Sequence, residues 1–72
     1  MRMTAGEYLA WSRKKECPYN VSDVKALVKA AKASFGDSVL FCHNMIVEDA
    51  NKCLWAWSGG ETKTFYPLSG ED

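Results

Sequence analysis

The spacing of apolar residues changes at Gly36, and this change constrains the fold of the 72-residue chain more than any other feature. Before Gly36, apolar side chains recur at helical intervals. After it, apolar residues follow the period of two and the β-branched and aromatic bias of strands. The order predicts an α+β fold with two N-terminal helices followed by an antiparallel sheet.

The first helix is marked by a capping box, in which Thr4 accepts from the amide of Glu7 and Glu7 reaches back. Apolar residues then recur at helical spacing. Cys17 precedes Pro18, and a residue before proline avoids the α region. We predict a helix over residues 5–16.

The second helix is predicted over residues 23–35, with Ser22 as N-cap and Gly36 taking a positive φ beyond its end. One stripe of its surface is apolar and another is basic. The apolar stripe is Val24, Leu27, Val28, Ala31 and Phe35, and the basic one is Lys25, Lys29 and Lys32.

Three strands are predicted after Gly36, at about 38–47, 53–58 and 61–66. The polar segment 48–52 connects the first two, and a two-residue turn at Gly59-Gly60 connects the last two. The fold class is therefore α+β, with two N-terminal helices and a three-stranded antiparallel β-meander.

These turns place Trp57 opposite His43 in the first strand and opposite Thr62 in the third. Because side chains alternate, Trp55 and Trp57 then share a face with Tyr66. Large apolar groups occupy both faces. Either the helices cover both faces or one apolar face meets a partner, and core packing under the second helix is the alternative role for the tryptophans.

Length and composition favour one small domain over residues 1–72, since 47% hydrophobic and 25% charged residues exclude a disordered chain. No apolar run is long enough to cross a membrane, and no signal peptide is recognisable. Three cysteines without C-x-x-C spacing favour a reducing compartment. We expect a cytoplasmic protein.

The cysteines and the single histidine do not form a convincing chemical site. Zinc would need Cys17, Cys42, His43 and Cys53 to converge, yet adjacent strand residues 42 and 43 point to opposite faces. The same geometry separates His43 from a Cys42 nucleophile. We expect no enzyme, no metal and no cofactor.

The net charge of zero divides into +4 over residues 1–36, with seven basic and three acidic residues, and −4 over residues 37–72, with two and six. The lysines of the second helix could steer a charged partner, or form an ordinary solvated face. Single-stranded nucleic-acid binding is the alternative function, but the acidic half would repel phosphates.

Three stretches carry a family resemblance: residues 21–27, the Phe35-Gly36 helix end, and Leu54-Trp55-Ala56-Trp57 before a glycine-containing hairpin. Over about residues 21–66 the chain resembles small phage-encoded inhibitors such as type I-F anti-CRISPR proteins. The helix at residues 4–16 departs from the members with a single helix. The resemblance implies a non-enzymatic protein that blocks a host complex by occupying its nucleic-acid or subunit-binding surface.

The sequence thus predicts a protein-interaction module, in its most concrete form a phage-type inhibitor of a host protein or ribonucleoprotein complex. The predicted contact residues are Trp55 and Trp57 as aromatic anchors and Lys25, Lys29 and Lys32 as steering charges. A homodimer, in which the second sheet face meets its copy, is a further alternative.

Overall fold

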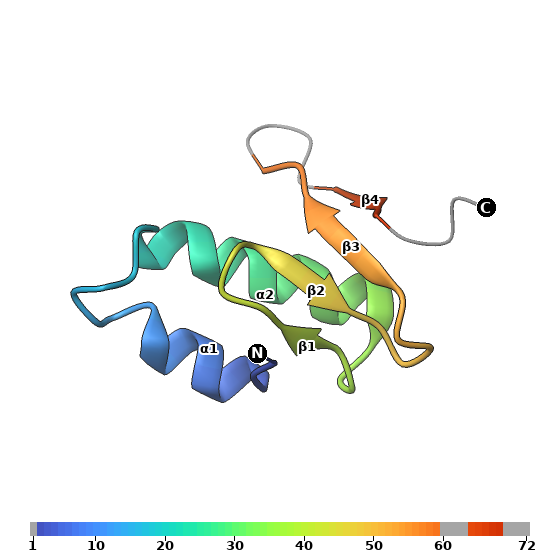
Figure 1. Ribbon diagram of the computed structural model, residues 1–72, viewed down its shortest axis with the longest axis horizontal. Helices are drawn as coiled ribbons and strands as arrows, with labels where there is room; N and C mark the ends of the chain where they lie inside the picture. Colours follow the sequence, from blue (N-terminus) through green and yellow to red (C-terminus); the bar gives the residue numbers. More distant parts are fainter. Residues whose placement is uncertain (1, 60–63, 69–72) are drawn as a thin grey trace.

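The computed structural model describes residues 2–59 and 64–68. Its elements are α1 (Ala5–Trp11), α2 (Val21–Phe35), β1 (Leu40–Phe41), β2 (Ile46–Glu48), β3 (Leu54–Trp57) and β4 (Phe65–Pro67). The strands form one antiparallel sheet in the order β1-β2-β3-β4 (Figure 1). The predicted α+β class is confirmed, but the predicted count of three strands is wrong.

Helix α1 has the predicted capping box, with Thr4 and Glu7 each accepting the other's backbone N–H. It ends at Trp11 and not at residue 16. The hydroxyl of Ser12 donates to the carbonyl of Leu9, and the next amide, Arg13, bonds three residues back to Ala10. Serine competes for helix carbonyls in this way, and such tighter turns are typical of a helix end.

Helix α2 begins at Val21, two residues before the predicted start, because Asn20 and not Ser22 is the N-cap. The Asn20 side chain accepts from the amide of Asp23. The helix ends as predicted at Phe35, and Gly36 takes a φ of 90°. Neither helix in the described ranges is long and apolar enough to cross a membrane.

The predicted first strand, 38–47, is in fact a hairpin of β1 and β2. The amide of Cys42 bonds to the carbonyl of Ile46, so the chain reverses at residues 43–45. Met45 takes a φ of 63°, a left-handed conformation that interrupts an extended strand. The residues on either side have strand character, so composition alone does not reveal the reversal.

The β2–β3 register differs from the predicted one by two residues. A hydrogen-bonded pair, Asp49 and Cys53, closes a three-residue loop in which Lys52 has a φ of 66°. The backbone amide of Trp57 therefore donates to the carbonyl of Met45, so Trp57 lies opposite Met45 and not opposite His43. An even shift preserves the faces, so Val47 and Trp55 still lie together.

The β3–β4 register differs by three residues, and an odd shift exchanges the faces. Trp57 pairs with Phe65, and the amide of Ser58 bonds to the carbonyl of Thr64. A five-residue connection replaces the predicted two-residue turn, and residues 60–63 of it lie outside the described residues. Phe65, not Tyr66, shares the face of the two tryptophans.

Residues 2–4 run beside β1 and complete the sheet on that edge. Met3 exchanges two backbone hydrogen bonds with Phe41, of 2.7 and 2.8 Å. Because neighbouring residues alternate, the Met3 side chain enters the core while Arg2 reaches Glu48 on the opposite face.

The core lies between α2 and the sheet face that carries Phe41 and Val47, and α1 packs beside α2 and β1 (Figure 1). The ring of Tyr8 stacks on Phe41 with centroids 5.1 Å apart. The predicted stripe of α2 enters this core: four members are buried and Phe35 packs against them. The buried four are Val24, Leu27, Val28 and Ala31.

Tyr8 is fully buried, yet its hydroxyl has no hydrogen-bond partner among the described residues. Burial also raises its pKa, so the hydroxyl stays protonated. An unsatisfied buried hydroxyl costs about 1–3 kcal/mol. We expect Tyr8→Phe to raise the free energy of unfolding by about 1 kcal/mol in urea denaturation.

The matched control for this substitution is Tyr66→Phe, because Tyr66 is about half exposed. Removing a solvated hydroxyl should change the stability by less than about 0.5 kcal/mol. A loss of stability in Tyr8→Phe would show that the Tyr8 hydroxyl is satisfied in solution.

Candidate functional site

Neither helix covers the sheet face that is turned away from α2. We call this face the outer face. The registers align Leu40, Glu48 and Leu54 in one row across it, and Ile46, Ala56 and Tyr66 in the next. Leu68, whose amide donates to the carbonyl of Leu54, extends the first row. Apart from Glu48 and Tyr66, every residue of these rows is wholly apolar.

Exposure increases across the outer face toward β4. Tyr66 is 52% and Leu68 45% exposed, and they are the exposed large hydrophobic residues of the described chain. Leu54 and Ile46 are partly buried, while Ala56 is small and lies between Ile46 and Tyr66. The apolar surface therefore continues from the sheet centre to its β4 edge.

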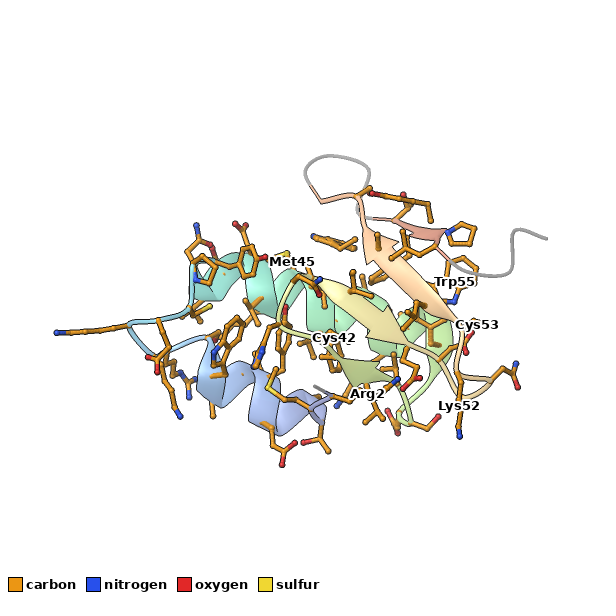
Figure 2. All side chains as sticks on the ribbon, viewed as in Figure 1. Arg2, Cys42, Met45, Lys52, Cys53 and Trp55 are labelled. Atoms are coloured by element: carbon orange, nitrogen blue, oxygen red, sulfur yellow. The ribbon has the colours of Figure 1, made fainter. Side chains whose placement is uncertain are left out.

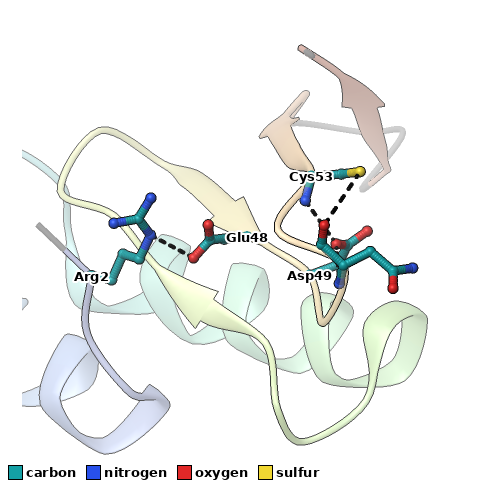
Figure 3. A network of polar contacts seen from close by, with 5 residues as sticks. Arg2, Glu48, Asp49 and Cys53 are labelled. Atoms are coloured by element: carbon teal, nitrogen blue, oxygen red, sulfur yellow. Dashed lines mark hydrogen bonds and ion pairs between the residues drawn. The ribbon is translucent and has the colours of Figure 1, made fainter. Parts of the chain in front are cut away.

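One ion pair lies on this apolar face, between Arg2 Nε and Glu48 Oε1 (Figure 3). The Glu48 side chain is only 8% exposed, whereas that of Arg2 is 55% exposed. Beside the pair, a hollow of about 410 Å³ is lined by Arg2, Cys42, His43, Asn44, Ile46 and Leu54. The two rows of the outer face thus carry a single charged pair among apolar side chains.

The structure places Trp55 and Trp57 on the opposite face of the sheet, toward α2. The Trp55 ring lies 5.2 Å from Phe35, and that of Trp57 lies 4.9 Å from Phe65, centroid to centroid. Both are partly buried and pack against the core. These contacts match the core-packing alternative, and a role as partner anchors stays a prediction.

Asp49, which the sequence predicts only as part of a polar turn, is a structural residue. Its Oδ1 accepts the amides of Asn51 and Cys53, each at 2.9 Å, and its Oδ2 accepts the Trp55 indole N–H at 3.0 Å. Figure 3 shows Asp49 beside Cys53, and the bond to Trp55 lies outside that view. The carboxylate therefore shapes the hairpin loop and orients Trp55. In the sequence, the signal for this role is a short acidic residue placed just before a turn.

The pKa of Asp49 is lowered, chiefly by the Cys53 amide and then by the Trp55 indole. A carboxylate with a depressed folded-state pKa stabilises the fold fully above its unfolded pKa of about 3.9. That stability is lost as the pH falls through the folded pKa. We expect Asp49→Asn to lower the melting temperature at pH 7, with the difference from wild type narrowing at pH 3.

Thermal unfolding followed by circular dichroism at the two pH values checks this expectation. Asp37→Asn is the control, since Asp37 is exposed and no hydrogen bond engages its carboxylate in the described part of the chain. A difference between wild type and Asp49→Asn that is equal at both pH values would contradict the proposed linkage.

Lys25, Lys29 and Lys32 are exposed on α2, outside its buried stripe. Figure 1 shows α2 as a separate layer behind the sheet. The structure therefore does not bring the lysines together with the outer face. Their steering role stays a prediction.

The cysteines are partly buried free thiols. Within residues 2–59 and 64–68, no group of three or more histidine, cysteine or acidic side chains is placed to hold a metal ion. Figure 2 shows Cys42 and Cys53 on different parts of the sheet.

Comparisons with protein-family models, with curated proteins and with solved structures found no match. The resemblance to phage-encoded inhibitors therefore stays a prediction.

Proposed function

We propose that this protein is a non-enzymatic protein-interaction module that docks on a partner through its outer face. The observation that carries the proposal is the position of Tyr66 and Leu68. Both lie on the one sheet face that neither helix covers. Leu68 is paired with Leu54, and Ala56 lies between Tyr66 and Ile46. A contiguous apolar patch of this kind is typical of an interaction site.

The energetics of association favour the same surface. Tyr66 supplies a large ring with few rotatable bonds, and tyrosine is enriched among the residues that dominate binding energy. Tyr66 and Leu68 provide exposed apolar area at the β4 edge of the face. Their partly buried neighbours Leu54 and Ile46 continue the apolar area toward the sheet centre.

The more specific proposal is a cytoplasmic, phage-type inhibitor of a host defence or nucleic-acid-handling complex. It follows from the resemblance over residues 21–66 and from the absence of a catalytic constellation in the sequence. In this proposal the outer face occupies a surface that the host complex needs for its own subunit or nucleic acid.

Single-stranded nucleic-acid binding is the second candidate, supported by the exposed lysines of α2. The tryptophans that would stack on bases are instead packed against Phe35 and Phe65. A base-stacking surface needs free ring faces next to the basic groups. The geometry therefore favours a protein partner.

The test is affinity capture from host lysate, comparing wild type with Tyr66→Glu and Leu68→Glu. We expect each charge to weaken partner binding by about 30-fold or more, because hot-spot residues contribute at least about 2 kcal/mol. Ala33→Glu is the control, since it adds the same charge at an exposed position of α2. Circular dichroism verifies folding of every variant.

A partner retained equally by all the variants would overturn the proposal. Two further measurements separate the alternatives. A doubled mass in light scattering that reverts in Leu68→Glu identifies a second copy as the partner. Oligonucleotide binding at low salt that is lost on neutralising the three lysines identifies nucleic acid.

A further inference from the structure

A second hollow, of about 290 Å³, lies at the end of the sheet formed by the β1–β2 turn. Four segments converge there: the residue before the α2 cap, the first turn of α2, the β1–β2 turn and the end of β3. Its lining is Tyr19, Asp23, Met45, Trp57, Ser58 and Gly59. Figure 2 marks Met45 at this end of the sheet.

Two aromatic rings of the hollow are held in place by other rings. Tyr19 meets Trp11 edge-on at 6.3 Å, and Trp57 meets Phe65 at 4.9 Å. Both side chains remain partly exposed. The face of such a ring is electronegative and attracts a cation, most strongly for tryptophan.

The hollow also has polar groups that the described fold leaves unused. Asp23 is exposed, and no hydrogen bond or ion pair holds its carboxylate among the described residues, although its amide is fixed by Asn20. The indole N–H of Trp57 likewise has no acceptor there. Trp55, by contrast, gives its indole N–H to Asp49.

A carboxylate and two aromatic rings that line one hollow match a cation of a particular shape. A guanidinium group is planar, stacks on aromatic faces and donates two parallel hydrogen bonds to a carboxylate, whereas an ammonium group is a compact, strongly hydrated charge. The positive N-terminus of α2 opposes a cation, but its partial charge of about 0.5 is smaller than the full charge of Asp23.

We propose that this hollow binds an arginine side chain of a partner polypeptide. The guanidinium lies against Trp57 and Tyr19 and pairs with Asp23, while the indole N–H of Trp57 donates to a backbone carbonyl of the same peptide. The hollow belongs to a different face from Tyr66 and Leu68. The proposal therefore does not depend on the outer face.

The test is a titration with N-acetyl-arginine-N-methylamide, followed by the ¹H–¹⁵N resonance of the Trp57 indole. The Trp57→Phe variant assigns that resonance among the three tryptophans. We expect a saturable shift of this resonance. The citrulline analogue, which is isosteric and uncharged, should bind about tenfold more weakly, because its hydrogen bonds to the carboxylate are no longer charge-assisted.

Asp23→Asn should weaken binding of the arginine derivative by a similar factor, about tenfold, and Asp37→Asn should leave it unchanged. The amide resonances of each variant report whether its fold is preserved. The proposal is overturned if the Trp57 resonance does not shift, if citrulline binds equally well, or if the two aspartate variants behave alike. Capture of a partner through Tyr66 and Leu68 is measured separately and does not affect this result.

Discussion

Phe41→Ala should lower the free energy of unfolding by about 3–5 kcal/mol, the range for removing a buried aromatic side chain. Phe41 is fully buried, its ring stacks on Tyr8, and its backbone pairs with Met3. A domain of this length has a total stability of about 4–11 kcal/mol. The substitution therefore removes a large share of the stability and leaves part of the population unfolded at 37 °C.

The measurement is urea denaturation followed by circular dichroism, with Leu40→Ala as the control. Leu40 is the neighbour of Phe41 on β1, but it lies on the outer face and is only partly buried. We expect Leu40→Ala to cost about 1 kcal/mol. Equal losses of stability at the two positions would mean that Phe41 does not face the core while Leu40 faces outward.

Arg2→Ala should cost about 2–3 kcal/mol, because it leaves the Glu48 carboxylate buried without its ion-pair partner. The value lies below that for a fully buried pair, since the Arg2 side chain is 55% exposed and solvent screens its charge. Leaving a charge buried without a partner costs more free energy than losing the attraction between the two charges.

The distinguishing measurement is the double variant Arg2→Ala/Glu48→Leu. An apolar residue needs no charge partner and suits the apolar surroundings of the outer face, so we expect it to recover most of the loss. Arg13→Ala is the control, because Arg13 is exposed and no ion pair engages it in the described chain. Failure of the double variant to recover stability would show that Arg2 acts through packing and not through charge.

The helices could be predicted because local sequence determines them. The Thr4–Glu7 capping box and the positive φ at Gly36 depend on neighbouring residues, and successive members of the apolar stripe of α2 are at most four positions apart. The predicted boundaries are wrong at helix ends where two local capping arrangements compete. Asn20 and Ser22 are both good N-caps, and Ser12 ended α1 by bonding to its own preceding turn.

The strand pairing is harder to predict from the sequence, because it depends on loop geometry. The reversal at residues 43–45 depends on Met45 taking a left-handed φ, which its residue type disfavours. The longer β3–β4 connection moved Tyr66 to the outer face by an odd shift in register. The candidate surface therefore contains Tyr66, which the predicted register places on the tryptophan face.

By itself, the sequence determined the α+β class, the two helices and the presence of apolar side chains on both faces of the sheet. Periodicity and capping are local, so they need no knowledge of distant contacts. Only the tertiary structure decided which face α2 covers, since that depends on the registers of β2, β3 and β4 and on Phe41 meeting Tyr8. It turned Trp55 and Trp57 toward the core and left Tyr66 and Leu68 exposed.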